Sequence, residues 1–207
     1  MAATPSAMVE LGTSAPDFHL PDVVTGRIVS RDDFAGSPAL LVMFICNHCP
    51  YVRHVAEEIV RVGRDYQARG VAIVAISSND VGQYPDDRPE RMAEIAGLMG
   101  LTIPYLYDET QQAAKAYEAA CTPDFFLYDR DRRLVYRGQL DGARPANDVP
   151  VTGADLRGAL DAVLEGRPAP ATQHPSVGCS IKWKPGNEPG AVLLGKTGAG
   201  SKSGGPN

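Results

Sequence analysis

The hydrophobic positions along this chain form two kinds of run, and each kind predicts a different element. Residues 39–45 and 71–76 are apolar at every position, which is typical of central strands that are covered on both faces. Between them, apolar residues recur at spacings of three and four from Val52 to Tyr66, which predicts an amphipathic helix that ends before Gly70. The chain is therefore expected to pass from a buried strand into a helix and on to a second buried strand.

Shorter patterns on either side complete the predicted order of elements. Residues 17–20 alternate polar and apolar side chains, and a turn within residues 25–29 leads into a second short strand. Beyond the second buried strand the pattern predicts a helix over 89–99, a strand over 103–107, a helix over 110–120, a hairpin of strands 125–128 and 134–137, and a last helix that starts at a capping box, Thr152 to Asp155, and stops at Gly166.

Two strand–helix pairs followed by a hairpin and a final helix are the order of elements in a thioredoxin-type sandwich. Right-handed crossovers and layer packing leave few competing topologies for this order. We therefore predict an α/β fold, a thioredoxin-like three-layer sandwich with a central mixed β-sheet and an N-terminal β extension.

Length and composition divide the chain into one domain with flanking segments. At 207 residues the chain can bury the core of one domain, which we assign to residues 13–166. Residues 1–12 are expected to be a loose leader, and residues 167–190, which hold the only tryptophan, an extension that packs on the domain. Residues 191–207 are rich in glycine, serine and lysine and are expected to be disordered.

Charge and hydropathy exclude several classes of partner. The formal net charge is −5 and the chain has no block of basic residues, so nucleic acid and anionic membrane surfaces are poor partners. The apolar runs are much shorter than the roughly 20 residues that span a bilayer. Because residues 1–10 show neither the basic nor the apolar region of a secretory signal, we expect a cytoplasmic protein.

Two of the four cysteines, Cys46 and Cys49, stand where the first buried strand meets the first helix. The first turn of a helix has unpaired N–H groups and partial positive charge, which lower the pKa of a thiol placed there. Two intervening residues also bring the sulfurs close enough for a reversible disulfide. The alternative is half of a zinc site, but such a site normally needs a second pair, and Cys121 and Cys179 are far apart in the sequence. The spacing favours redox chemistry without a metal.

Other residues extend this candidate site. His48, between the two cysteines, is expected to stabilise the Cys46 thiolate and make the dithiol more oxidising, and the alternative is a solvent-facing histidine. Thr122 and Pro123 open a predicted strand. A proline that begins a strand near a dithiol suggests a cis bond, although X-Pro bonds are most often trans.

The remaining two cysteines each have a functional and a structural interpretation. Cys121 directly precedes the Thr-Pro pair, so it either resolves an oxidised Cys46 or is a small buried thiol. Cys179 lies in the proline- and glycine-rich extension near Trp183. That segment either folds over the site and offers a resolving thiol or a lid, or it is a structural cap in which Trp183 covers an apolar face.

Four segments of the chain carry a resemblance to a known family. They are Ala15-Pro16-Asp17-Phe18, Phe44-Ile45-Cys46-Asn47-His48-Cys49-Pro50-Tyr51, Ala120-Cys121-Thr122-Pro123-Asp124-Phe125-Phe126-Leu127 and Gly178 to Lys184. The first three resemble the redoxin family, the thioredoxin-fold group that includes alkyl hydroperoxide reductase and thiol-specific antioxidant proteins, and the last is similar to a segment of its peroxiredoxin-like branch. The resemblance covers residues 13 to about 190. It implies a thioredoxin fold, a redox-active Cys46–Cys49 pair and a cis bond before Pro123.

Two departures from the peroxiredoxin pattern separate the possible activities. Peroxiredoxins carry a threonine three residues before their peroxidatic cysteine, and Cys46 holds that position if Cys49 is matched to that cysteine. They also carry an arginine shortly before a Phe-x-x-Asp strand end, where this chain has Pro123 ahead of Phe126 and Asp129. Without those donors a peroxide is poorly polarised. Disulfide exchange needs only the pair and a peptide-docking edge beside the cis-proline, so we favour exchange.

We therefore predict a thiol–disulfide oxidoreductase in which Cys46 attacks and Cys49 resolves. The expected substrate is a disulfide-containing protein or a small thiol compound, and the expected reductant is thioredoxin or a low-molecular-weight thiol. Two alternatives remain. One is a thiol peroxidase in which Cys46 or Cys49 is oxidised by peroxide, and the other is a non-enzymatic module whose cysteines hold zinc. No cofactor, nucleic acid or membrane is expected to take part.

Overall fold

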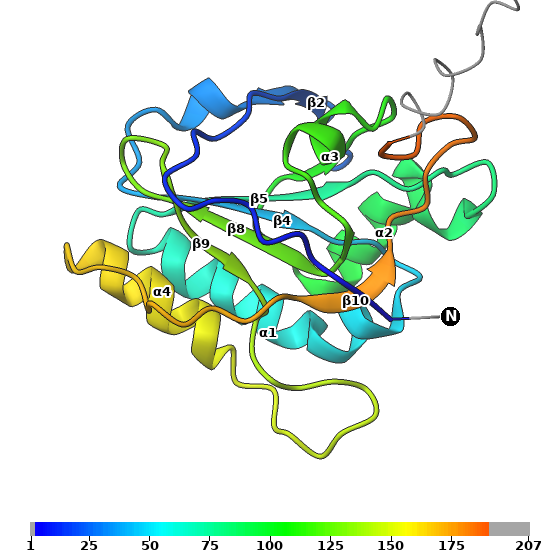
Figure 1. Cartoon of the computed structure of the whole chain (residues 1–207). Helices are drawn as coiled ribbons and strands as arrows, with labels where there is room; N and C mark the ends of the chain where they lie inside the picture. The colour runs from blue at the N-terminus through cyan, green and yellow to red at the C-terminus, as the bar shows by residue number, and fades with distance from the viewer. Residues whose placement is uncertain (1–2, 191–207) are drawn as a thin grey trace, which may run out of the picture.

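A central sheet of five strands organises the computed structural model, which describes residues 3–190 (Figure 1). The strands lie in the order β6-β5-β4-β8-β9. β4, β5 and β6 run parallel, whereas β8 runs antiparallel to both of its neighbours, β4 and β9. This confirms the predicted mixed sheet. The strands span Leu40–Phe44 (β4), Ala72–Ser77 (β5), Tyr105–Tyr107 (β6), Asp124–Tyr128 (β8) and Leu134–Gly138 (β9).

Alternate side chains of β4 build a separate core on each face of the sheet. Leu41 and Met43 pack with α1, α2 and α4, and Leu40 and Val42 pack with α3 on the other face. Figure 1 shows α1 and α4 below the sheet and α3 above it, which gives the three predicted layers. Within residues 3–190, none of the helices has the length and apolar character needed to cross a membrane. The helices span Pro50–Gln67 (α1), Pro89–Met99 (α2), Gln112–Ala116 (α3) and Ala154–Leu164 (α4).

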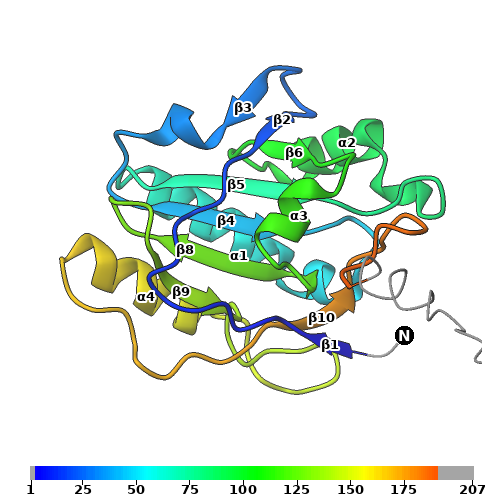
Figure 2. The ribbon, with the colours of Figure 1, turned by 45° about the horizontal axis from the view of Figure 1, so that its top comes forward.

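The predicted N-terminal β extension is present beside β6 (Figure 2). β2 (His19–Pro21) and β3 (Ile28–Ser30) pair antiparallel, and a bridge between Asp22 and Leu106 ties them to β6. The extension therefore continues the fold on the β6 side of the central sheet. Two short 3-10 helices lie in the connections, at Arg31–Phe34 and Pro85–Asp87.

A second, three-stranded sheet joins segments from both ends of the chain. β10 (Val177–Ser180) lies between β1 (Ala3–Pro5) and β7 (Cys121–Thr122) and runs antiparallel to both. The prediction of a loose leader over residues 1–12 is therefore wrong for the residues of β1, because they are paired in a strand.

The segment that follows α4 lies against the domain. Ile181, just after β10, is buried, and Trp183 packs partly buried against the same core cluster as Val42. Residues 167–190 thus hold an element in contact with the domain, while the predicted disordered tail over 191–207 lies outside the described residues. The domain boundaries themselves stay a prediction.

Two elements are shorter than the sequence pattern predicts. α3 spans only Gln112–Ala116 instead of 110–120, because Gln111 and Glu118 adopt positive φ angles of 61° and 52°. Such angles lie in the left-handed region and interrupt a right-handed helix. β6 begins only at Tyr105. The central part of each predicted element is present, and the ends differ.

The predicted capping box of α4 is wrong. The N-cap is Gly153, at a φ of 67°, rather than Thr152. The backbone N–H groups that lead into the helix are satisfied from a distant loop, because the Asp141 carboxylate accepts hydrogen bonds from Thr152 (2.7 Å) and Gly153 (2.6 Å). In the first turn, the N–H of Leu156 donates to the carbonyl oxygen of Leu140. A side chain eleven residues upstream of Thr152 therefore supplies the oxygen that a capping box would place next to the helix.

We expect Ile59→Ala to lower the free energy of unfolding by about 2–5 kcal/mol, the usual cost of truncating a large buried aliphatic side chain. Ile59 is fully buried where α1 packs on the sheet. Leu98→Ala is the matched control, since Leu98 on α2 is 77% exposed and should lose little stability. Urea denaturation followed by circular dichroism measures both, and equal losses would contradict the packing of α1 described above.

Candidate active site

The dithiol lies where β4 passes into α1. Cys46 follows the end of β4, and Cys49 is the N-cap of α1, with Pro50 as the first helical residue. Both side chains are buried: Cys46 is 2% exposed and Cys49 is 0% exposed. All residues of β4 are buried as well, so the pair stands on a rigid support at the carboxyl end of a central strand.

Thr122 contacts both sulfurs. Its hydroxyl lies 3.3 Å from Cys46 Sγ, and its carbonyl oxygen accepts a hydrogen bond of 3.1 Å from Cys49 Sγ. The bond between Thr122 and Pro123 is cis, as the family resemblance implies. The predicted site residues Thr122 and Pro123 therefore lie beside the dithiol.

The two thiols influence each other, and their pKa values move in opposite directions. A hydrogen bond with the Cys49 thiol, with burial and the nearby Asp87 carboxylate, raises the pKa of Cys46 well above its usual range. The same bond lowers the pKa of Cys49 to about 4, with help from the backbone N–H groups of Val52 and Cys179 and against the effect of burial. Cys49 is therefore the more acidic thiol of the pair.

His48 has a different partner from the one that the sequence suggests. Its Nδ1 lies 2.5 Å from Asp87 Oδ2 but 3.9 Å from Cys46 Sγ. The ring also stacks on Tyr84, with centroids 5.0 Å apart. The expected direct stabilisation of a Cys46 thiolate by His48 is thus replaced by a hydrogen bond between His48 and Asp87.

Asp87 is the site residue that the sequence reasoning missed. Its carboxylate accepts hydrogen bonds of 2.8 Å from the backbone N–H of Asn47 and from the side chain of Asn79, in addition to its bond with His48. Burial raises the pKa of Asp87, but these hydrogen bonds outweigh burial and hold it below its usual value. The sequence did hold one indication that Asp87 lies near the dithiol. The loop over 85–89 follows β5, and the carboxyl ends of neighbouring parallel strands meet at one edge of a sheet.

Cys121 lies behind Pro123 rather than facing the dithiol. Its side chain is fully buried, and its Sγ is 3.8 Å from the carbonyl oxygen of Pro123. Burial raises the pKa of Cys121 far above its usual range. Its complete burial and its contact with the Pro123 carbonyl favour the small buried thiol over a resolving cysteine.

Cys179 is brought against the dithiol by β10. It lies opposite Thr122 in the pairing of β10 with β7. It also packs in the same buried cluster as Cys46 and Cys49. Burial, followed by the proximity of Cys49, raises the pKa of Cys179 to about 11. Because Trp183 also packs on the core, the same segment caps the domain and carries a third thiol to the site.

β10 also occupies the edge on which a peptide was expected to dock. The predicted docking edge beside Pro123 is not free, because β7 is paired there with β10. This prediction is therefore wrong for this conformation. A substrate in extended conformation has to displace β10 before it can pair with β7.

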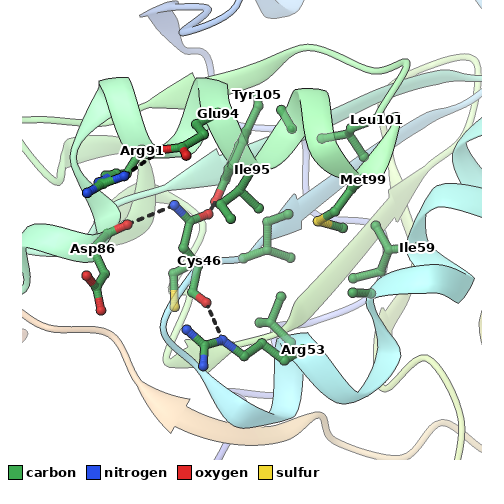
Figure 3. A pocket seen from close by; sticks show the side chains of 15 residues that line it. Cys46, Arg53, Ile59, Asp86, Arg91, Glu94, Ile95, Met99, Leu101 and Tyr105 are labelled. Atoms are coloured by element: carbon green, nitrogen blue, oxygen red, sulfur yellow. Dashed lines mark hydrogen bonds and ion pairs between the residues drawn. The ribbon is translucent and has the colours of Figure 1, made fainter.

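A cavity of about 490 Å³ opens between α1 and α2 next to the dithiol. Figure 3 shows Cys46 and Asp86 at one end and the apolar side chains of Met99 and Leu101 at the other. The guanidinium group of Arg53 stands at the wall and donates to the carbonyl oxygen of Asn47 at 2.9 Å. The volume lies in the range of small-molecule sites, and Cys46 is the cysteine that lines it.

The third interpretation of the sequence, a zinc-binding module, finds one possible donor set in the described residues. Donor atoms of Cys46, His48 and Asp87 all lie within 4.8 Å of one another. Two ligands of a tetrahedral zinc ion stand about 3.3 Å apart, whereas His48 Nδ1 and Asp87 Oδ2 are separated by 2.5 Å. That separation suits a proton between the two atoms, so this arrangement does not fit a zinc ion.

Comparisons with known proteins agree with this fold. A crystal structure of an uncharacterized conserved protein from Geobacillus kaustophilus is similar, with 57% identity, a TM-score of 0.88, and coverage of 89% of this chain and 98% of that one. The thioredoxin domain of a thiol-disulfide oxidoreductase from Bacteroides vulgatus shares the fold, with 19% identity and a TM-score of 0.54 over 63% of this chain and 89% of its own. The fold is thus thioredoxin-like, as predicted.

Sequence relatives identify the family. The thiol:disulfide interchange protein DsbE of Allochromatium vinosum is 24% identical over 157 residues, which are 74% of this chain and 80% of that protein. The narrower resemblance to a peroxiredoxin-like branch stays a prediction. The model of the AhpC/TSA family matches residues 11–137, more than half of the chain, and the chain therefore belongs to the AhpC/TSA family.

Proposed function

We propose that this protein is a thiol–disulfide oxidoreductase that uses Cys46 and Cys49 as its dithiol/disulfide couple. The observation that carries the proposal is the buried Cys46–Cys49 pair at the start of α1, beside the cis bond between Thr122 and Pro123. Two thiols this close in the chain at a helix start, with Cys49 the more acidic of the two, need little movement to form a disulfide. The contacts of Thr122 with both sulfurs support the same proposal, because they hold the pair in one orientation.

The first step begins with the proton of Cys46. It passes to the Cys49 thiolate, so Cys46 becomes the thiolate that attacks one sulfur of a substrate disulfide. The substrate S–S bond breaks, a bond forms between Cys46 and the attacked sulfur, and the leaving sulfur departs as a thiolate. Cys46 suits this part because it lines the cavity beside α1.

The second step returns the charge to Cys49. Once Cys46 is in a mixed disulfide, the N–H groups at the start of α1 still favour a thiolate at Cys49. That thiolate attacks the Cys46 sulfur, releases the second half of the substrate as a thiol, and leaves a Cys46–Cys49 disulfide. A reductant outside the chain, thioredoxin or a low-molecular-weight thiol, then restores the dithiol. We place this cycle in the cytoplasm, where such reductants act, with a disulfide-containing protein or a small disulfide as substrate.

Cys46→Ser should reduce the rate of disulfide reduction by about a thousandfold or more, because a hydroxyl does not replace a thiolate nucleophile. A single-turnover assay with 4,4′-dithiodipyridine, which releases a coloured thione, measures this loss. Cys121→Ala is the matched control, since it removes another buried thiol, on the neighbouring strand β7, and should react at close to the wild-type rate. Reduction by Cys46→Ser at the wild-type rate would refute the assignment of Cys46 as the nucleophile.

Asp87→Asn should make Cys46 reactive at lower pH. The Asp87 carboxylate raises the pKa of Cys46, so its removal lowers that pKa and shifts the onset of thiolate formation toward acid. The rate of Cys46 alkylation by iodoacetamide, followed by mass spectrometry as a function of pH, measures the shift. Asp86→Asn makes the same charge change at the exposed neighbouring residue and should shift the profile less. Equal shifts in the two variants would contradict a specific effect of Asp87.

The family match favours a second candidate, a thiol peroxidase, because the AhpC/TSA family model covers both cysteines. In this reaction Cys46 or Cys49 attacks a peroxide oxygen, becomes a sulfenic acid and releases water or an alcohol. We expect reaction with hydrogen peroxide in a stopped-flow experiment to be no faster than that of free cysteine, since Pro123 stands where a peroxiredoxin has its arginine. A rate several orders of magnitude faster would replace the exchange proposal with the peroxidase.

A further inference from the structure

β10 meets β7 in the way that a substrate strand meets the edge of a sheet. It runs antiparallel to β7, and its cysteine, Cys179, stands opposite Thr122. The same Thr122 contacts both sulfurs of the dithiol. In the binding mode known as strand addition, an extended peptide pairs with a sheet edge through main-chain hydrogen bonds and directs side chains into a site. Here the added strand belongs to the chain itself.

Cys179 lies next to one particular member of the dithiol. It stands opposite Thr122, whose carbonyl oxygen contacts the Cys49 sulfur, and it packs in the same buried cluster as Cys46 and Cys49. The proximity of Cys49 also contributes to the raised pKa of Cys179. Cys49 is therefore near both of the other two thiols.

β10 is pressed closely against β7 at this point. A Cβ atom on Gly178 would collide with the carbonyl oxygen of Thr122, so only glycine permits this approach next to Cys179. The strand is also held on its other edge by β1 and beyond its end by Lys182, whose N–H donates to Asn79 at 2.8 Å. β7, β1 and the hydrogen bond of Lys182 therefore hold the strand that carries Cys179 in place.

We propose that Cys179 is a third redox cysteine, and that the disulfide of the oxidised site exchanges between Cys46–Cys49 and Cys49–Cys179. In this step the Cys179 sulfur attacks the Cys49 sulfur of the Cys46–Cys49 disulfide. The bond between Cys46 and Cys49 breaks, a bond between Cys49 and Cys179 forms, and the proton lost by Cys179 ends on Cys46. No electrons enter or leave, so the step needs no further oxidant or reductant.

The exchange has a chemical consequence for Cys46. An oxidised site that holds a Cys49–Cys179 disulfide has a free Cys46 thiol next to the cavity, able to react again. Loss of the Cys49 charge on oxidation also removes one of the contacts that keeps the Cys179 thiol protonated. The inference rests on the proposed function, because it takes the Cys46–Cys49 disulfide as its starting point.

Trypsin provides a clear readout of this exchange. Cleavage leaves Cys46 and Cys49 together in residues 32–53 and Cys179 in residues 158–182. A Cys46–Cys49 bond therefore stays within one peptide, whereas a Cys49–Cys179 bond joins two. The full-length protein is oxidised with glutathione disulfide and incubated with N-ethylmaleimide for increasing times. It is then digested with trypsin without reduction, and the peptides are identified by mass spectrometry.

In wild-type protein we expect alkylation of Cys46 to rise together with the joined peptides. Cys179→Ala should slow this alkylation by about tenfold or more, because no thiol remains to open the disulfide from the Cys49 side. Cys121→Ala is the control that removes a different buried thiol, and its Cys46 should be alkylated as in wild type. Equal alkylation of Cys46 in wild type and Cys179→Ala would overturn the exchange.

A second variant tests the contact without disturbing β10. Cys46→Ser retains Cys49 and Cys179, and oxidation by glutathione disulfide should join the two tryptic peptides with release of two glutathione thiols. Absence of the joined peptides overturns the inference, while a Cys46–Cys49 bond in the wild type still supports the proposed couple. Joined peptides in the wild type without any Cys46–Cys49 bond would instead refute the couple and leave Cys179 as the partner of Cys49.

Discussion

The sulfurs of Cys46 and Cys49 both contact one residue of a neighbouring strand, and the geometry of the site depends on this contact. Thr122 meets Cys46 Sγ through its hydroxyl and Cys49 Sγ through its carbonyl oxygen. The start of α1 alone would place the two cysteines near each other but would leave their side chains free to turn. Since β7 is itself held by β10, a strand near the C-terminus takes part in orienting a dithiol more than 130 residues earlier in the chain.

The electrostatics of the site come from two loops at the same edge of the sheet. One loop follows β4 and carries the dithiol to the helix start, where N–H groups favour a thiolate at Cys49. The other follows β5 and carries Asp87, whose charge disfavours a second anion at Cys46. His48 bonds to this carboxylate at 2.5 Å. The result is an uneven pair in which Cys49 is the more acidic thiol and Cys46 the less acidic one.

The sequence predicted what depends on local patterns and missed what depends on long-range pairing. The apolar run of β4 and the stripe of α1 placed Cys46 and Cys49 correctly, because strand, dithiol and helix are continuous. β1 and β10 have three and four residues, too few for any period to be detected. The contact of Asp87 with His48 spans 39 residues, and only the register of parallel strands brings the two loops together.

The pairing of β10 with β7 bears on which substrates reach the dithiol. An extended polypeptide has to break that ladder, whose hydrogen bonds contribute roughly 0.5–1.5 kcal/mol each, and also disturb the packing that continues from β10 to Trp183. A small disulfide that enters the cavity between α1 and α2 meets Cys46 and leaves β10 in place. The two approaches therefore use different parts of the site, the cavity between α1 and α2 for a small disulfide and the edge of β7 for an extended chain.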